Sequence, residues 1–184
     1  MGNMFYQLFE MFGPAKRRII IIGLDAAGKT TMLYRMKLNK TIEPSPTVGH
    51  NAESITFNNI EFNCWDINSN RKVRSLWFHY YAGTHAVIFV IDANDLERIQ
   101  EAKDVLFEVM GHELLKDAAL LVMANKMDLP DCMSVDQIIE FLSLKDQLPN
   151  TKWHVQAAEA ITGRGLYEGF QWLCIALTSN DKTP

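Results

Sequence analysis

Residues 23–30 have the types and spacing of a loop that holds phosphate groups. Their sequence, GLDAAGKT, fits the pattern GxxxxGK(S/T) and lies between an apolar run and a helical segment. Glycines let the backbone wrap closely around phosphates, while successive N–H groups and a helix N-terminus supply positive potential. Lys29 can reach the β and γ phosphates, and the hydroxyl of Thr30 can bind magnesium. A glycine-rich turn that binds nothing is the alternative, but strand, spacing and helix together favour a nucleoside triphosphate site.

A second polar loop, Asn125-Lys126-Met127-Asp128, follows the apolar run 119–124, at the edge of the sheet where ligands of such folds collect. The carboxylate of Asp128 can accept from both the ring N–H and the exocyclic amine of guanine, a pair of donors that adenine lacks. Asn125 is expected to tie this loop to the phosphate loop, and the stem of Lys126 to lie along the purine. Alone, the four residues would indicate only a polar turn. After a phosphate loop they match NKxD, the element that makes GTPases specific for guanine.

The elements that position these loops alternate along the chain. The first strand, 17–23, contains four consecutive isoleucines, which is typical of a central strand buried on both faces. Alternating apolar residues predict a hairpin of strands 54–57 and 60–66 around Asn58-Asn59, because Asn tolerates the positive φ of such turns. Further strands are expected at 86–91, 119–124 and 153–157, and helices at 29–38, around 99–109, after a Ser134/Gln137 capping box and over 166–177. The pattern predicts an α/β phosphate-loop NTPase fold: a doubly wound, six-stranded, mostly parallel sheet with one antiparallel edge hairpin.

Composition limits the class of protein further. The 184 residues suffice for one globular domain, and a formal net charge of -4 argues against a nucleic-acid partner. Three cysteines without a CxxC pair suggest reduced thiols rather than disulfides or a zinc site. No apolar run approaches the ~20 residues of a membrane span, and the N-terminus lacks the pattern of a secretory signal. A cytosolic monomer that binds a small ligand or a protein partner is expected.

The chain resembles the Arf family of small GTPases over about residues 2–178. The resemblance rests on runs such as GLDAAGKTT at 23–31, LVMANKMDLPD at 121–131 and GLYEGFQWL at 165–173. It implies GTP and GDP as ligands, with magnesium held by Thr30, by the switch residue Thr47 and, through water, by Asp66. It also implies nucleotide contacts from the phosphate loop and from the loop after the last strand, namely from Asp25, Ala26, Ala27, Gly28, Lys29, Thr30, Thr31, Glu159 and Ala160. In that last loop, the family directs the backbone N–H that corresponds to Ala160 toward the guanine carbonyl.

The second switch departs from the family, which reads WDVGGQ where this chain reads WDINSN at 65–70. Ser69 replaces a glycine that touches the γ phosphate, and its Cβ costs ~1 kcal/mol or more where the switch must adopt positive φ. Asn70 replaces the glutamine that orients the attacking water and is one methylene shorter. Very slow hydrolysis is expected, because catalysis here is mostly positioning. Backbone movement that restores the reach of Asn70 is the alternative.

A second departure concerns the aromatic patch that effectors of this family recognise. His50 stands at a phenylalanine of that patch, and Trp65 and Tyr80 supply its other members. Histidine reduces the apolar area and titrates near neutral pH. A tolerated surface substitution and a changed set of effectors both remain open.

Residues 1–15 form a segment ahead of the domain, 16–184. Gly2 opens an incomplete myristoylation motif, because Tyr6 replaces the usual Ser or Thr. One helical face of the segment carries Met4, Phe5, Leu8, Phe9 and Phe12. One acyl chain binds membranes only marginally, so this face and the basic residues that follow would supply a second signal. The resemblance implies that the helix docks on the domain with GDP and moves to the membrane with GTP; permanent packing on the domain is the alternative.

These features predict an Arf-like guanine-nucleotide switch in vesicle and protein transport, peripheral on the Golgi or other endomembranes. The implied partners are an exchange factor, effectors or coat proteins, and the membrane surface. A scaffold that binds guanine nucleotide without cycling, or binds none, is the alternative of a different class. An ATP-using kinase is disfavoured by Asp128 and by the lack of a recognisable lid.

Overall fold

The structure, a computed structural model, describes residues 15–38, 50–58, 60–67 and 71–178. The strands are β1 (Ala15–Gly23), β2 (His50–Phe57), β3 (Ile60–Ile67), β4 (Ala86–Asp92), β5 (Ala119–Asn125) and β6 (Trp153–Ala157). The helices are α2 (Lys29–Leu38), α3 (Ile99–Met110), α4 (Val135–Leu142), α5 (Leu144–Gln147) and α6 (Leu166–Thr178), with the 3-10 helices η1 (Arg71–Tyr80) and η2 (Glu113–Leu115). Four predicted functional residues lie outside the described ones: Gly2, Thr47, Ser69 and Asn70.

The six strands form one sheet in the order β2-β3-β1-β4-β5-β6. Neighbouring strands are parallel except β2 and β3, which form an antiparallel hairpin with Phe57 opposite Ile60. Asn58 in the hairpin turn has a φ of 46°, the left-handed conformation expected there. The predicted fold class, a doubly wound and mostly parallel sheet with an antiparallel edge hairpin, is confirmed.

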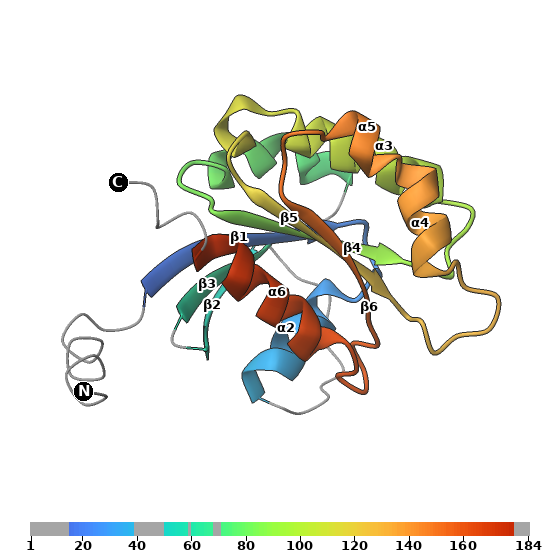
Figure 1. The fold of residues 1–184 in the computed structure, drawn as a ribbon, viewed down its shortest axis with the longest axis horizontal. Helices are drawn as coiled ribbons and strands as arrows, with labels where there is room; N and C mark the ends of the chain where they lie inside the picture. Colours follow the sequence, from blue (N-terminus) through green and yellow to red (C-terminus); the bar gives the residue numbers. More distant parts are fainter. Residues whose placement is uncertain (1–14, 39–49, 59, 68–70, 179–184) are drawn as a thin grey trace, which may run out of the picture.

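Helices cover both faces of the sheet, with α2 and α6 on one face and α3, α4 and α5 on the other (Figure 1). Strand β1 lies inside this sandwich and contributes to the core on both sides. Ile20 and Ile22 pack into one apolar cluster, and Ile19 and Ile21 into the other. All four isoleucines are completely buried. Because successive side chains of a strand point to opposite faces, a strand covered on both sides is apolar without alternation.

Two helices show the local signals that the sequence predicts. Ser134 caps α4: its hydroxyl accepts from Gln137 N at 3.2 Å, while Oε1 of Gln137 accepts from Ser134 N at 2.8 Å. The buried face of α6 includes Leu166, Phe170, Leu173 and Leu177. Several features differ from the prediction. Strands β1 and β2 begin at Ala15 and His50 rather than at residues 17 and 54, and the sequence pattern did not indicate η1, η2 or α5.

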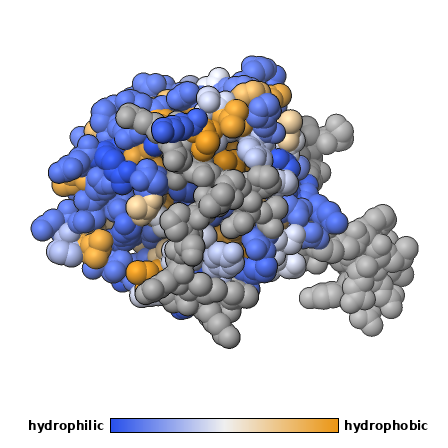
Figure 2. Space-filling model, turned by 180° about the vertical axis from the view of Figure 1, so that it is seen from behind, coloured by the Kyte–Doolittle hydropathy of each residue, from blue (hydrophilic) through white to orange (hydrophobic). Residues whose placement is uncertain are grey.

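The face of the molecule that Figure 2 shows is mostly polar. Hydrophilic residues predominate there, and hydrophobic ones gather in small separate patches. Among the described helices, none combines the length and apolarity that a membrane crossing requires.

Candidate functional site

The predicted site residues meet at one edge of the sheet, beyond the carboxyl ends of the parallel strands. All parallel strands end at the same edge, so loops far apart in the chain become neighbours there. Hydrogen bonds join the phosphate loop to the end of β3, to the base loop after β5 and, through the base loop, to the loop after β6. The sheet therefore assembles the site from four separate segments.

The phosphate loop needs glycine at two of its positions. Gly23 has a φ of +145° and Gly28 of +97°, conformations that residues with a side chain rarely adopt. A Cβ at Gly23 would lie 2.3 Å from Val90 O, and a Cβ at Gly28 would lie 2.2 Å from Nδ2 of Asn125. Gly23 thus lets the backbone at the end of β1 lie in close contact with the backbone of the neighbouring strand β4. Gly28 lets the phosphate loop approach the base loop.

Lys29 begins α2 and is almost completely buried, with 7% of its surface exposed. Its Nζ donates a hydrogen bond to Leu24 O at 2.8 Å, so the side chain folds back over the phosphate loop. Burial lowers the pKa of Lys29 to about 8, although the carboxylates of Asp66 and Asp25 act in the opposite direction. An anion bound in this loop would favour the charged amine that burial disfavours.

Thr30 and Asp66 meet where α2 begins and β3 ends. The Thr30 hydroxyl donates a hydrogen bond to Oδ2 of Asp66, and Asp66 has no exposed surface. A hydroxyl next to a carboxylate provides the oxygen ligands that magnesium prefers. Both residues therefore fit the metal site that the sequence predicts.

Asn125 joins three loops and is 3% exposed. Its Nδ2 donates to Ala27 O at 2.7 Å, which is the tie to the phosphate loop that the sequence predicts. Its Oδ1 accepts from Ala160 N at 2.9 Å, a bond that was not anticipated. The N–H of Ala160, which the family resemblance directs to guanine, is therefore engaged by Asn125 here. A contact of this N–H with a base requires a change of partner.

The base loop continues with Lys126 and Asp128. Lys126 has a φ of 65°, and its Nζ pairs with Oδ2 of Asp92, the last residue of β4, at 2.6 Å. Met127 N donates to Ala158 O at 3.2 Å, which holds the base loop against the loop after β6. Asp128 is exposed, so its carboxylate is accessible to a ligand.

Glu159 forms hydrogen bonds within its own loop, residues 159–164. Its carboxylate accepts from Thr162 Oγ1 at 2.9 Å and from Arg164 Nη1 at 3.0 Å, and its backbone N–H donates to Arg164 O at 3.0 Å. The side chain and the N–H are thus used within residues 159–164. These contacts give Glu159 a role in shaping the loop, and its contact with nucleotide stays a prediction.

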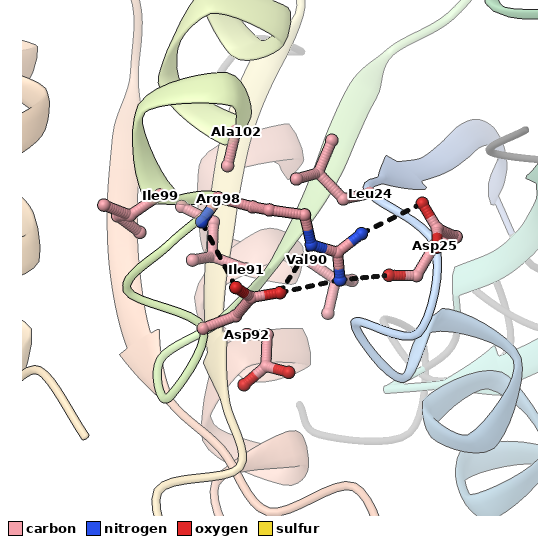
Figure 3. Close-up of a pocket in the computed structure, with 9 residues that line it drawn as sticks. Leu24, Asp25, Val90, Ile91, Asp92, Arg98, Ile99 and Ala102 are labelled. Carbon is pink, nitrogen blue, oxygen red and sulfur yellow. Dashed lines mark hydrogen bonds and ion pairs between the residues drawn. The ribbon is translucent and has the colours of Figure 1, made fainter. Parts of the chain in front are cut away.

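Two predicted phosphate-loop residues lie on the solvent side of the loop. Ala26 is exposed and has a φ of 60°, which is unusual for a residue with a Cβ. The side chain of Asp25 is 63% exposed and forms an ion pair with Arg98, with Nη1 and Oδ1 3.2 Å apart (Figure 3). Ala27 is buried, and Thr31 is half-buried in the first turn of α2.

Sequence reasoning missed Arg98. It stands at the N-cap of α3, and Asp95 three residues earlier accepts hydrogen bonds from its Nε and its backbone N–H. An Asp three residues before an Arg at a helix start was the available signal for that local pair. Nothing local indicates the bond to Asp25, 73 positions away in the chain.

Two members of the predicted aromatic patch come together. The rings of Trp65 and Tyr80 lie 5.7 Å apart. Arg18, which the sequence did not single out for this patch, places its guanidinium carbon 4.6 Å from the centre of the Trp65 ring and donates from Nη2 to Tyr80 O at 3.2 Å. The backbone of His50 pairs with Ile67 at the adjoining end of β2; its side chain lies outside the described part of the chain.

The site defines a class of protein. A glycine loop between a buried parallel strand and a helix, with a buried lysine at the helix start, is the arrangement of phosphate-loop nucleotide-binding proteins. A family model narrows the class, because the model of the ADP-ribosylation factor family matches residues 3–177. The chain belongs to the ADP-ribosylation factor family, so the resemblance noted from the sequence is confirmed.

A solved structure agrees with this assignment. The chain is similar to the Arl6 BBS3 small GTPase from Trypanosoma brucei, which was solved with the bound nucleotide analogue GppNp. The two share 29% sequence identity over 90% of this chain and 99% of that chain, with a TM-score of 0.83.

Proposed function

We propose that this chain binds GTP and GDP with magnesium and works as a nucleotide-controlled switch. The observation that carries the proposal is Asn125, whose side chain joins the NKMD loop to the phosphate loop. A loop specific for guanine and a loop that holds phosphates are thereby fixed side by side at one sheet edge. The bound analogue of the Trypanosoma brucei relative supports the same ligand class.

The binding step uses groups that are already in place. The backbone around Gly28 approaches the phosphates closely, and the ammonium group of Lys29 reaches them from the start of α2. Asp128 accepts from the two N–H donors on guanine, and Lys126, anchored at Asp92, lies along the base. Each group holds one part of the ligand, so phosphate and base are recognised together.

Thr30 and Asp66 would hold magnesium, joined by Thr47 when a triphosphate is bound. The ion, when present, neutralises charge on the β and γ phosphates. The hydrogen bond between Thr30 and Asp66 keeps both oxygen groups at one place before the ligand arrives.

Hydrolysis by this chain is proposed to be slow. Asn70 carries the amide that would orient the attacking water, but on a side chain one methylene shorter than glutamine. Positioning accounts for most of the catalysis in this reaction, and a partner's arginine adds its ~10³- to 10⁵-fold only to a positioned water. The switch would therefore remain long in its triphosphate state.

The switch is proposed to act at a membrane in vesicle-mediated transport. The support is the N-terminal sequence, where Gly2 is a candidate acylation site ahead of an aromatic helical face. The clustered Trp65 and Tyr80, with His50 nearby in β2, would contact effectors or coat proteins. Flotation with anionic vesicles tests this step: acylated protein is expected to float with a GTP analogue and not with GDP, and Gly2→Ala should abolish flotation.

A second candidate function is a scaffold that holds guanine nucleotide without cycling. Ser69 and Asn70 together favour it, because both replace residues that the family uses to respond to the γ phosphate. In that case nucleotide serves to stabilise the fold, and partners bind irrespective of its state.

The decisive experiment identifies the bound nucleotide and then follows its fate. Nucleotide released from purified protein is identified by chromatography, and single-turnover GTP hydrolysis is compared between wild type and Asn70→Gln. Asn68→Gln lengthens a neighbouring amide in the same way and serves as control. Bound guanine nucleotide with faster hydrolysis only in Asn70→Gln supports the switch. Bound nucleotide without rescue supports the scaffold, and absence of guanine nucleotide overturns the switch and leaves a scaffold that binds none.

A further inference from the structure

Arg98 connects α3 to the phosphate loop. Its Nη1 donates to Oδ1 of Asp25 at 3.2 Å, and its Nη2 donates to the backbone oxygen of Asp25 at 3.4 Å. One guanidinium thus holds both the side chain and the main chain of a single phosphate-loop residue. Figure 3 shows the side chain reaching from the start of α3 across to that loop.

Asp95 orients the guanidinium. Its Oδ2 lies 2.6 Å from Nε and 2.6 Å from Nη2 of Arg98, while its Oδ1 accepts from the backbone N–H of Arg98 at 3.2 Å. Asp95 is also the first cause of the raised pKa of Arg98. A guanidinium is planar and offers several donors in a fixed fork. Once Asp95 holds Nε and Nη2, the edge formed by Nη1 and Nη2 can point in only one direction, toward Asp25.

The surroundings restrict the side chain further. Arg98 lines a pocket together with the carboxylates of Asp25, Asp92 and Asp95 and with five apolar residues, Leu24, Val90, Ile91, Ile99 and Ala102. The apolar neighbours come from the phosphate loop, from β4 and from α3. An arginine whose stem lies against packed groups and whose head is fixed by a carboxylate loses little freedom when it binds Asp25.

The charge of Asp25 matters because of where it lies. Asp25 is part of the phosphate loop, and the charge of its carboxylate acts on Lys29, where it partly opposes the lowering of the pKa by burial. A carboxylate in a loop that holds phosphates would repel them unless a cation neutralises the carboxylate or holds it aside. Ala26, the next residue, has a φ of 60°, so the loop conformation after Asp25 is one that a residue with a Cβ resists.

We propose that Arg98 is a positioning residue for nucleotide retention: it neutralises Asp25, holds that carboxylate away from the phosphates, and so slows release of the nucleotide. The inference rests on the proposed binding of guanine nucleotide. Asp95 aims the guanidinium, and Arg98 itself contacts the loop rather than the ligand. Loss of Arg98 releases a negative charge beside the phosphates, and removal of that charge repairs the defect.

The experiment measures the rate at which a fluorescent GDP analogue leaves the full-length protein at fixed magnesium. The variants are Arg98→Met, Asp25→Asn and the double variant. Arg98→Met is expected to speed release about tenfold. The double variant is expected to release nucleotide within about twofold of Asp25→Asn alone, because the repulsion has been removed. A purely structural role of Arg98 would leave the double variant as fast as Arg98→Met.

Lys103→Met is the matched control, because Lys103 is a long cation on the same helix whose Nζ bonds to Phe141 O at 2.5 Å, away from the phosphate loop. Its release rate should equal that of wild type. Should Arg98→Met not fold, Arg98→Lys is measured instead, since it keeps the charge and loses the fork. Release no faster than in Lys103→Met, or a double variant as fast as Arg98→Met, overturns the inference while leaving the proposed function intact. Failure of wild type to bind the analogue overturns the proposed function.

Discussion

The two ends of the ligand site are built differently. On the side of β4, β5 and β6, polar side chains join neighbouring loops: Asn125 bonds to Ala27 and to Ala160, and Lys126 pairs with Asp92. On the side of β3, the chain continues into η1, a 3-10 helix ten residues long. Such helices seldom run beyond three or four residues, because their hydrogen bonds are poorly aligned.

Burial reinforces the contrast. In η1, Trp77 is 2% exposed, but its neighbours Leu76 and Phe78 are 51% and 47% exposed. Trp77 therefore anchors a segment in which Val73 and Tyr80 are half-buried and Leu76 and Phe78 face solvent. We therefore expect the loops after β4, β5 and β6 to bind the ligand in a fixed frame, and the segment after β3, which includes η1, to respond to it.

The largest expected effect comes from breaking the fixed side at Gly28. In Gly28→Ala, the new Cβ meets Nδ2 of Asn125 at 2.2 Å, and the φ of +97° disfavours any side chain. GDP affinity is expected to fall by at least about 100-fold, measured by calorimetry. Gly83→Ala is the control: Gly83 also has a positive φ, +71°, but nothing lies within 4 Å of its Cβ position. That control should cost ~1 kcal/mol of stability and leave affinity unchanged; equal losses in both variants would contradict the argument.

The second effect tests the guanine end of the same side. Asp128→Asn loses one charged acceptor for the guanine donors, so GDP affinity should fall about 10- to 100-fold. Affinity for xanthosine diphosphate should rise, because xanthine has a carbonyl where guanine has its amine and the Asn amide can donate to it. Competition binding with the two nucleotides measures both. Asp131→Asn, an exposed change in the same loop at a φ of 60°, should alter neither. Unchanged preference in Asp128→Asn would remove the base loop from recognition.

The third effect concerns η1, the segment that follows β3 and is expected to respond to the ligand. Arg74 in η1 forms an ion pair with Glu101 in α3 at 2.7 Å, and both side chains are largely buried. Arg74→Met is expected to lower the free energy of unfolding by ~1 kcal/mol in urea and to change GDP affinity less than about threefold. Lys116→Met removes a fully exposed pair with Glu113 and should give no measurable change. A large loss of GDP affinity in Arg74→Met would show that the two sides are not separate.

The smallest effect appears only in alkali, at Tyr81 just after η1. Burial, with a smaller contribution from the charge of Glu108, raises the pKa of Tyr81 from 10.0 to about 12. The folded state thus favours the protonated phenol, so this stabilisation is complete below pH 10 and is lost as the pH rises through 12. Relative to pH 8, wild type should lose ~1 kcal/mol at pH 11 that Tyr81→Phe retains. Urea unfolding at the two pH values measures it, and equal losses would contradict the shift.

Local patterns predicted much of the fold. The four isoleucines of β1 and the Ser134/Gln137 capping box each depend on residues within one element, and their physical meaning does not depend on the rest of the chain. The bond between Asn125 and Ala27 also followed, because both loops follow parallel strands, β1 and β5, that end at the same edge of the sheet with β4 between them. A motif with known topology thus allowed one long-range contact to be predicted.

Other contacts could not be predicted because each one depends on two side chains that only the folded structure brings together. Arg98 with Asp25, and Arg18 with Trp65, join residues without a shared motif. The hydrogen bond from Ala160 N to Asn125 Oδ1 depends on the path of the loop backbone, which side-chain types do not encode. No element was predicted at residues 71–80, where the structure has the 3-10 helix η1.

The side-chain amide of Asn125 has a consequence for when the loops after β1, β5 and β6 open. Because it holds the loops after β1 and β6 as well as its own, none of the three can detach without breaking a bond that another one shares. Fluctuations of the three loops are therefore coupled into one cooperative unit. In amide hydrogen exchange these loops should be deprotected together, so phosphate and base would leave the protein in one concerted event rather than one after the other.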